Sequence, residues 1–281
     1  MAAERPSWLS VEQREAPLIV SFPHTGTDIP PDIEARCVSP WLARKDADWW
    51  IDKLYDFVRE LGATTIHTAI SRTVIDVNRD PSGVSLYPGQ NTTELVPSTT
   101  FDGEPLWRTG MAPDAADIAR RIATFFDPYH AALTAEIARL RGRHPRVTLY
   151  DCHSIRSIVP RLFPGELPVM NIGTNSGASC DMDLAEPIAA IASASRFSAV
   201  INGRFKGGYI TRHYGAPEHG VHAVQMELAC RGYMREPIGP VDERSWPVPY
   251  DPGFAADIRA TLRAILETCL RFAANGNSRP A

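Results

Sequence analysis

Apolar residues recur every three or four positions along two long stretches of the chain, 113–143 and 254–272. This period places the apolar side chains on one face of a helix, so each stretch is predicted to be helical. Weaker patterns of the same period predict helices over 46–61, with Gly62 at the carboxyl-terminal stop, and over 183–194. The apolar positions of the two long stretches are Ile118, Ile122, Phe126, Tyr129, Leu133, Ile137 and Leu140, then Phe254, Ile258, Leu262, Ile265, Leu266 and Phe272.

Short runs rich in β-branched residues lie between the predicted helices, and several are apolar at every position. Continuous apolar character is typical of strands that helices cover on both faces. Strands that alternate with helices predict an α/β fold of three layers, α/β/α, with a central mixed, mostly parallel sheet. The intervals 80–112 and 229–252, rich in Pro, Gly, Thr and Asp, are predicted to be long ordered loops. The predicted strands are 17–22, 63–69, 73–77, 146–151, 168–173, 197–202 and 221–228.

Composition and charge narrow the class of protein. Of the 281 residues, 44% are hydrophobic and 22% charged, and no linker divides them, so one domain over 1–281 is expected. The net charge of −4, without a basic block, argues against nucleic-acid and membrane partners. No secretory signal is recognisable, and the five cysteines are scattered, which favours reduced thiols and a cytoplasmic location. The oligomeric state is left open.

Two histidines closely follow apolar strands. His24 stands two residues after the run 17–22, and His153 stands two residues after 146–151 and its last residue, Asp151. Because ligands bind beyond the carboxyl ends of the strands in open α/β sheets, the two imidazoles are expected to meet there. Imidazole and carboxylate are common zinc ligands, and Asp151 would orient an imidazole from outside. The alternative is two unrelated histidines with ordinary hydrogen bonds.

Positively charged side chains gather on short segments, although the chain as a whole is negative. Arg72 and Arg79 bracket the apolar run 73–77, with Asn78 beside the second arginine. The arginine fork matches a carboxylate, so this local reversal of charge indicates a small anionic ligand. The alternative is a set of solvated charges at strand ends. A further cluster over 202–215 contains Arg204, Lys206, Arg212 and His213 among glycines.

One carboxylate falls in an apolar strand. Glu227 lies near the end of 221–228, among Met226, Leu228 and Ala229. A carboxylate in apolar surroundings is costly unless it is paired or functional, and desolvation raises its pKa toward the range of a general base. A buried glutamate bonded to an arginine is the structural alternative.

Six segments are distinctive when taken together: SFPHTG (21–26), DADWWIDKLYD (46–56), SRTVIDVNRDPSG (71–83), LYDCHS (149–154), NGRFKGGYITRHYG (202–215) and HAVQMELACRGYM (222–234). Spread over most of the chain, they resemble the N-formylglutamate amidohydrolase (deformylase) family. That family is similar to the zinc carboxypeptidases and aspartoacylases. The resemblance therefore implies a fold like that of the zinc exopeptidases and the related phosphorylase/hydrolase proteins.

The resemblance implies that His24, His153 and one carboxylate bind a single zinc ion per chain, with cobalt, iron or manganese as alternatives. In the carboxypeptidases an acidic ligand stands three residues after the first histidine, where this chain has Thr27. The DADW segment is expected to supply that ligand instead, with Asp48 favoured over Asp46. Helix N-capping is the other role open to these aspartates. Three further histidines can replace a ligand: His213, His219 and His222.

The family resemblance also implies a reaction: zinc-dependent hydrolysis of N-formyl-L-glutamate to L-glutamate and formate, a step of histidine degradation. Glu227 would be the general base. Arg79 would bind the α-carboxylate or stabilise the oxyanion, and it is expected to act in catalysis as well as in binding. The other expected substrate contacts are Asn78 and Arg72, either Arg204 or Arg212 at the side-chain carboxylate, and the hydroxyl of Tyr209 or Tyr214.

Other functions are compatible with the same residues. A metal-dependent deacylase or carboxypeptidase acting on another N-acyl acidic amino acid would need the same metal, base and arginines. A non-catalytic protein that binds acidic metabolites is the alternative from a different class. A serine hydrolase is disfavoured because the chain contains no GxSxG motif.

Overall fold

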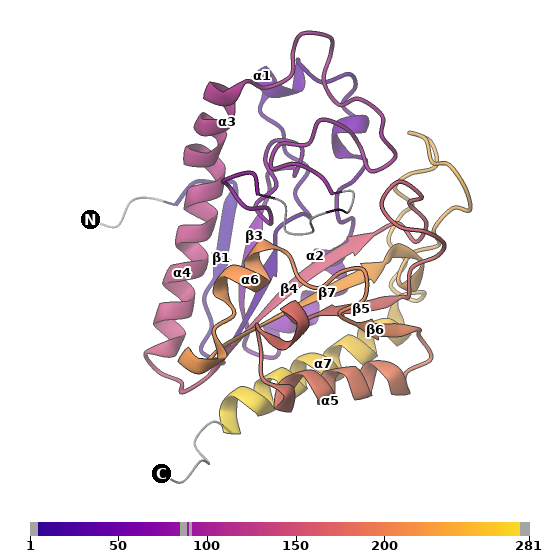
Figure 1. The fold of residues 1–281 in the computed structure, drawn as a ribbon. Helices are drawn as coiled ribbons and strands as arrows, with labels where there is room; N and C mark the ends of the chain where they lie inside the picture. Colours follow the sequence, from indigo (N-terminus) through magenta and orange to yellow (C-terminus); the bar gives the residue numbers. More distant parts are fainter. Residues whose placement is uncertain (1–4, 85–88, 90–91, 276–281) are drawn as a thin grey trace.

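A computed structural model describes residues 5–84, 89 and 92–275. The described residues form a seven-stranded sheet in the order β1-β3-β2-β4-β7-β5-β6 (Figure 1). Four neighbouring pairs are parallel, and the pairs β1·β3 and β5·β7 are antiparallel, which confirms the mixed, mostly parallel sheet. The strands are β1 (Leu9–Glu12), β2 (Leu18–Phe22), β3 (Thr64–Thr68), β4 (Val147–Ile155), β5 (Met170–Gly173), β6 (Ala199–Ile201) and β7 (Val221–Ala229).

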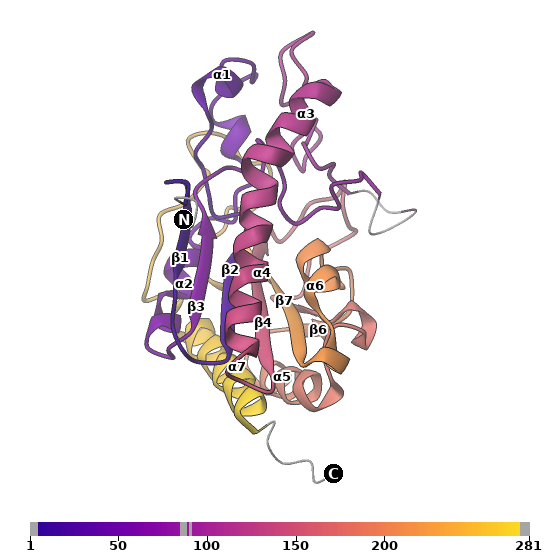
Figure 2. The same ribbon diagram turned by 90° about the vertical axis from the view of Figure 1, so that its left-hand side faces the viewer.

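Helices cover both faces of this sheet, which confirms the three-layer α/β/α architecture. Figure 2 shows α4 along one face, with α7 on the other side of the strands. Alternate residues of β2 face the two layers: Leu18 and Val20 pack in the core beneath α5 and α7, and Ile19 packs in the core beneath α4. No helix of the described residues is both long enough and apolar enough to span a bilayer. The α-helices are α1 (Pro31–Glu34), α2 (Ile51–Leu54), α3 (Ala115–Arg121), α4 (Asp127–Arg141), α5 (Met182–Ala194), α6 (Tyr209–Tyr214) and α7 (Ala256–Ala274).

The strongly periodic stretches are helical as predicted. Over 113–143 the chain is helical from α3 to α4 through one π-helical segment, and the Asp114 carboxylate caps its start by accepting from the Asp117 N–H at 2.8 Å. The carboxyl-terminal helix and the helix over 183–194 are confirmed as α7 and α5. The remaining short helical segments, named η, are η1 (Leu42–Arg44), η2 (Asp56–Arg59), η3 (Ile122–Phe126, the π segment), η4 (Asn175–Gly177), η5 (Pro217–His219) and η6 (Cys230–Gly232).

Two predicted elements are wrong. The stretch 46–61 is not one helix: Trp50 has a left-handed backbone with φ 64°, so no regular helix passes through it, and only the short segments α2 and η2 follow, on either side of Tyr55. The run 73–77 is not a strand: the N–H of Val74 bonds to the nearby Ser71 carbonyl, and the N–H of Asp76 bonds to Leu95. Its apolar side chains are nevertheless buried. Strand β1, at the sheet edge, was not predicted.

The loop after β2 approaches the end of β3 very closely. Gly26 packs on the backbone of Ala69, where any Cβ would collide with the Ala69 carbonyl group. The N–H of Asp48 donates to the His24 carbonyl at 3.0 Å, which joins this loop to the segment before α2. The fold thereby brings two of the predicted metal ligands to the carboxyl end of β2.

Candidate metal centre and substrate pocket

His24, Asp48 and His153 converge at the carboxyl ends of the parallel strands β2 and β4. The Nδ1 atoms of the two imidazoles are 3.1 Å apart, and the ring centroids are 4.8 Å apart. The Oδ2 atom of Asp48 lies 3.3 Å from Nδ1 of His153 and 3.7 Å from Nδ1 of His24. All three side chains are buried. The structure thus brings together the two histidines and the favoured aspartate.

The outer nitrogen of each imidazole is held by a carboxylate. The Nε2 of His24 lies 2.7 Å from Oδ1 of Asp76, and the Nε2 of His153 lies 2.7 Å from Oδ2 of Asp151. A carboxylate can only accept, so these partners place the proton of each neutral ring on Nε2 and leave a lone pair on Nδ1. Two Nδ1 lone pairs and the Asp48 carboxylate therefore face one another, an arrangement that a cation stabilises.

Asp48 is ionised despite its burial. Burial alone would raise its pKa, but the neighbouring imidazoles of His153 and His24 hold the pKa of Asp48 below the usual value. Its Oδ2 accepts from the Ser154 N–H at 3.1 Å. Its Oδ1 is buried and accepts no hydrogen bond from any described residue, although a nitrogen of Arg72 lies 3.6 Å away. One oxygen of this carboxylate thus faces two imidazole nitrogens while the other lacks a hydrogen bond, which fits a bound metal ion. Two histidines with one carboxylate are a common zinc ligand set.

The carboxylates of the cluster also act on the pKa of His153. Burial would lower the pKa of His153, but the carboxylates of Asp151 and Asp48 hold it well above the usual histidine value. Asp46, the second choice for the acidic ligand, is outside the cluster. Its Oδ2 accepts from the Phe101 N–H at 2.6 Å, and burial raises the pKa of Asp46 to about 6.

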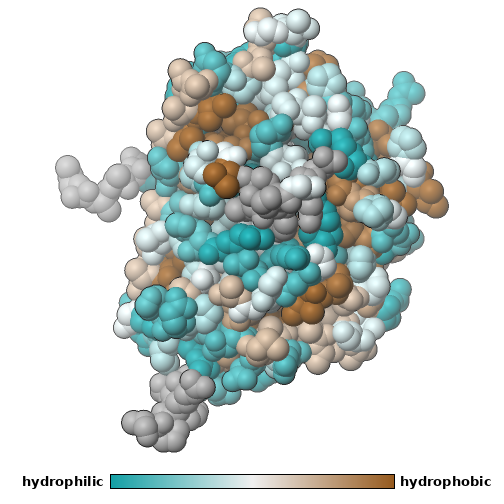
Figure 3. Space-filling view, in the orientation of Figure 1, coloured by the Kyte–Doolittle hydropathy of each residue, from teal (hydrophilic) through white to brown (hydrophobic). Residues whose placement is uncertain are grey.

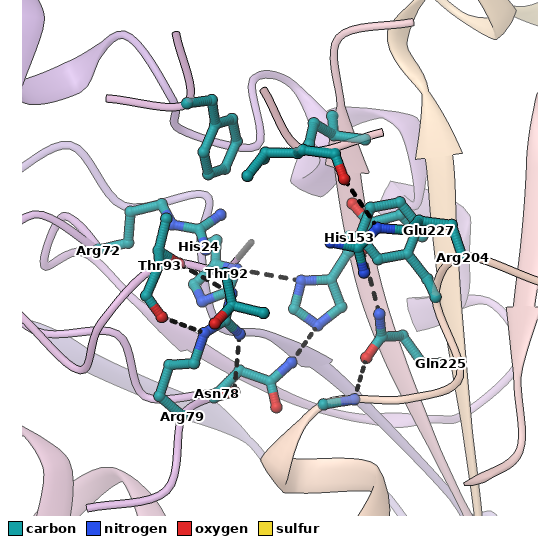
Figure 4. A pocket seen from close by; sticks show the side chains of 15 residues that line it. His24, Arg72, Asn78, Arg79, Thr92, Thr93, His153, Arg204, Gln225 and Glu227 are labelled. Carbon is teal, nitrogen blue, oxygen red and sulfur yellow. Dashed lines mark hydrogen bonds between the residues drawn. The ribbon is translucent and has the colours of Figure 1, made fainter. Parts of the chain in front are cut away.

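A pocket opens beside the cluster. Figure 4 shows the two imidazoles side by side, with Arg72 and Arg79 on one side and Glu227 and Arg204 on the other. The pocket is lined by predicted site residues from five different segments of the chain. Its lining is His24, Arg72, Asn78, Arg79, Thr92, Thr93, Phe101, His153, Ile155, Leu162, Arg204, Phe205, Gly208, Gln225 and Glu227.

Glu227 stands next to the cluster because β7 pairs with β4 in parallel, which sets Glu227 directly opposite His153. The carboxyl group is buried, and its Oε2 accepts from Nε2 of Gln225 at 3.1 Å. Gln225 in turn accepts from the Gly208 N–H at 2.7 Å. Burial raises the pKa of Glu227 to about 7, which suits a group that takes and returns a proton near neutral pH.

Three arginines reach the pocket, and each is anchored by part of its guanidinium group. Arg72 donates to Asp76 at 2.7 Å. Arg79 donates to the carbonyl and hydroxyl oxygens of Thr93 at 3.1 and 2.9 Å. Arg204 donates through Nε to the Leu162 carbonyl at 3.0 Å. The predicted concentration of positive charge at the site is present in the pocket wall.

Asn78 lines the pocket, but its amide is engaged behind the cluster. Its Nδ2 lies 2.9 Å from Nε2 of His153 and 3.3 Å from Oδ2 of Asp151, and its Oδ1 accepts from the Ile210 N–H at 2.8 Å. A Cβ on Gly208 would collide with this amide. Asn78 therefore links α6 to the histidine cluster.

Three predicted substrate contacts on α6, Arg212, Tyr209 and Tyr214, lie outside the pocket lining. Figure 3 shows the hydrophilic surface over α6, the helix that carries them. Arg212 donates through Nε to the Gly207 carbonyl at 2.9 Å, and the Tyr209 ring stacks on His213. The Tyr214 hydroxyl bonds to His130, 2.9 Å away. Of the three alternative ligands, His213 and His219 are exposed and His222 is buried at the other end of β7. Within the described residues none of the three joins the metal cluster.

Sequence reasoning missed two residues that hold the site together. Asp76 was counted as part of an apolar strand, yet it bonds to His24 and Arg72. The available signal was a single acidic residue inside the run TVIDV. Gln225, two residues before Glu227 on the same side of β7, carries no comparable signal, because its role depends on the approach of Gly208.

Comparison with known proteins gives consistent matches. A sequence model of the N-formylglutamate amidohydrolase family matches residues 16–234. An N-formylglutamate deformylase of Pseudomonas aeruginosa is 48% identical over 263 residues, covering 93% of this chain and 96% of the relative. A Pseudomonas putida protein of the same name is 42% identical over 267 residues, covering 95% and 97%.

Solved structures share the fold. The crystal structure of an N-formylglutamate amidohydrolase from Ralstonia eutropha JMP134 superimposes with a TM-score of 0.74 at 25% identity, covering 95% of this chain and 97% of that one. An Agrobacterium tumefaciens protein, at 18% identity, gives a TM-score of 0.71 over 95% and 96% of the two chains, and it supports the fold alone. The family match and the two Pseudomonas relatives, each covering most of the chain, show that this protein belongs to the N-formylglutamate amidohydrolase family.

Proposed function

We propose that this chain is a single catalytic domain that hydrolyses N-formyl-L-glutamate to L-glutamate and formate. The observation that carries the proposal is the buried cluster of His24, Asp48 and His153, whose two histidines line a pocket that also contains three arginines. The names of two relatives that are 48% and 42% identical support the formyl substrate. The family resemblance also supports a place in histidine degradation, and the scattered cysteines favour the cytoplasm.

The cluster would hold one divalent ion, with zinc the best match to two imidazoles and a carboxylate. Such an ion would supply Lewis acidity, which polarises a carbonyl group and makes water a stronger acid. Asp76 and Asp151 hold the outer nitrogens of His24 and His153, so both Nδ1 atoms point inward before any ligand arrives.

Glu227 would handle the proton. A water attacks the formyl carbon, and the Glu227 carboxylate accepts the proton that this water loses. The C–N bond then breaks, and the leaving amine of glutamate takes the proton back from Glu227. With a pKa near 7, Glu227 can both accept a proton and donate it at neutral pH, because neither protonation state is strongly favoured over the other.

The arginines would bind the two carboxylates of the substrate. Arg79 and Arg72 lie on one side of the pocket, and Arg204 on the other (Figure 4), which suits a ligand with a negative charge at each end. Arg79 would also stabilise the oxyanion; a donor of that kind is typically worth about 3 kcal/mol. The contacts expected of Arg212 and Tyr209 stay predictions, since neither side chain lines the pocket.

Asn78 would act mainly on the protein rather than on the substrate. Its amide already contacts His153 and Asp151 and accepts from Ile210. A substrate contact by Asn78 would have to be shared with these partners. We therefore propose that Asn78 donates to Asp151 and so holds the carboxylate that orients His153, while Arg79, its neighbour, binds the substrate carboxylate.

A substrate panel tests the proposal. Purified protein is incubated with N-formyl-, N-acetyl- and N-succinyl-glutamate and with N-formylaspartate, with and without added Zn²⁺, and the free amino acid is measured. We expect the fastest release from N-formylglutamate, loss of release on chelation and recovery with zinc. Faster release from another substrate would reassign the acyl group or amino acid. Tight binding of N-formylglutamate without turnover would favour a non-catalytic binder.

A further inference from the structure

A tight turn lies between the two segments that carry Asp48 and His153. This turn, residues 100–104, is called here the bridging turn. The Gly103 N–H donates to the Thr100 carbonyl at 2.9 Å, and Gly103 has φ 93°, which glycine adopts readily. The Thr100 hydroxyl donates to the Glu104 carboxylate at 2.8 Å. These bonds give the turn a defined shape without help from the substrate.

Asp102, in the bridging turn, joins the two segments through one atom. Its Oδ2 lies 2.6 Å from Nζ of Lys45 and 2.7 Å from a terminal nitrogen of Arg156. Lys45 precedes Asp48 by three residues, and Arg156 follows His153 by three. Both cations are buried, so neither can exchange Asp102 for water without cost. Asp102 thereby adds an ionic link to the direct bond from the Ser154 N–H to Asp48 and to the longer contact, 4.0 Å, between Arg156 and Asp46.

Phe101, the neighbouring residue, reaches into the pocket wall. Its N–H is held by Asp46 at 2.6 Å, and its ring lies 4.9 Å from the Cζ atom of Arg72. Arg72 is ion-paired to Asp76 at 2.7 Å on its other side. An aromatic ring over a desolvated guanidinium is attractive and restricts where that group can point. Phe101 therefore limits the orientation of one proposed carboxylate-binding arginine.

We propose that Asp102 and Phe101 are positioning residues of the site. Asp102 sets the spacing of the segments that bear Asp48 and His153, and Phe101 fixes Arg72. This inference rests on the proposed function, because it assigns the metal to Asp48 and His153 and the substrate carboxylate to Arg72. Neither Asp102 nor Phe101 transfers a proton or binds the metal.

Glu104 provides a matched control for Asp102. Its Oε2 lies 2.5 Å from Nζ of Lys45, so Glu104 shares one cation with Asp102. Arg156 is bonded to Asp102, and Glu104 has no ion pair with it among the described residues. The variants D102N and E104Q each remove one negative charge from the same turn, and D102N alone removes the charge shared by the two ligand segments.

The first arm of the test is metal affinity, which needs no catalysis. The zinc dissociation constants of the wild type, D102N and E104Q are measured by competition with a chromophoric chelator, and thermal unfolding of the metal-free proteins checks that all three are folded. We expect D102N to bind zinc about 10-fold more weakly, as is typical when groups that support ligands are removed, and E104Q to stay within about 2-fold of wild type. Equal affinity of D102N and wild type, equal losses in D102N and E104Q, or a wild type that binds no zinc would overturn the role of Asp102.

The second arm tests whether Phe101 affects substrate binding without affecting metal binding. F101L keeps apolar volume but removes the aromatic face, so we expect KM for N-formylglutamate to rise about 5-fold with kcat and zinc affinity unchanged. Unchanged KM, or a fall in zinc affinity, would overturn the role of Phe101. A wild type that binds zinc but releases no formate from N-formylglutamate would refute the proposed function instead, and the Asp102 arm would still be decided.

Discussion

The two ends of the strand pair β4 and β7 each hold a buried histidine, and the two ends differ in chemistry. These strands run parallel over nine residues, from Val147 opposite Val221 to Ile155 opposite Ala229. At the amino end His222 stands opposite Thr148, and at the carboxyl end His153 stands opposite Glu227. The exposed fractions are alike, 1% for His222 and 3% for His153. Burial therefore does not explain why one end forms a site.

The partners of each imidazole explain the difference. His222 accepts from the backbone N–H of Asp181 at 3.3 Å and packs edge-on against the Phe272 ring, so burial lowers the pKa of His222 to about 4 and the ring stays neutral. His153 meets the carboxylates of Asp151 and Asp48, which hold its pKa well above the usual value. Carboxylates gathered at the strand ends turn a buried imidazole into a site for positive charge.

Removing each histidine in turn gives the largest expected effect. His153→Ala deletes a proposed metal ligand and should lose zinc and turnover together, leaving only the uncatalysed background rate. His222→Gln, at the other end of the same strands, should keep both. Metal content of the purified proteins and formate release at pH 7 make the comparison. A His153→Ala protein that keeps one zinc and measurable turnover would contradict the metal assignment.

Glu227→Gln separates the proton transfer from metal binding at the carboxyl end. The amide cannot accept a proton from water, so kcat should fall by about 10²–10⁴-fold, the usual contribution of a general base. Zinc content should stay that of wild type, since Glu227 lies outside the ligand cluster. Wild-type turnover in this variant would show that another group takes the proton.

Regular helices are the part of this fold that the sequence predicts best. The helices over 113–143 and 254–272 were predictable because each buries one continuous apolar face, and that face is written into the residue period. The segment 46–61 has an apolar period too, but Trp50 takes a left-handed backbone that no period reveals. The left-handed residue lies two positions after Asp48, in the segment that directs Asp48 toward the histidines.

The site was predictable where a polar residue ends an apolar strand, as at His24, or interrupts one, as at Glu227. The role of Asp76 was not, because the run 73–77 is β-branched and apolar although its backbone bonds locally instead of joining the sheet. Composition cannot distinguish a buried strand from a buried loop. The choice between Asp46 and Asp48 likewise depends on which carboxylate the tertiary fold turns toward the histidines.

Asp151→Asn tests whether the outer carboxylate makes the carboxyl end a cation site. The amide can no longer supply a negative charge to Nε2 of His153, so zinc should bind about 10- to 100-fold more weakly. The Ser21 hydroxyl, which donates to Asp151 at 2.6 Å, can still bond to the new side chain and limits structural damage. Chelator competition gives the affinity. An unchanged dissociation constant would mean that this carboxylate does not support the ligand.

Arg79→Ala should affect the substrate and spare the metal. Losing one charge-assisted bond to a carboxylate is expected to raise KM for N-formylglutamate about 10-fold, and any fall in kcat would measure its share in stabilising the oxyanion. Arg79 is not a ligand, so zinc content should not change. Steady-state kinetics with parallel metal analysis decides the point, and unchanged kinetics would place Arg79 outside the substrate contacts.

The amino end supplies the last prediction, which concerns stability and leaves turnover at pH 7 untouched. Burial gives His222 a pKa of about 4 in the folded protein, against an ordinary value of 6.5. Between these two pH values the imidazole is protonated in the unfolded chain and neutral in the folded protein. The stabilisation present above pH 6.5 is therefore lost as the pH falls toward 4, by about 2 kcal/mol at pH 5. His222→Gln removes this titration. Urea unfolding at pH 7 and pH 5 should show wild type losing about 2 kcal/mol more than the variant; parallel losses would mean that His222 is protonated in the folded protein.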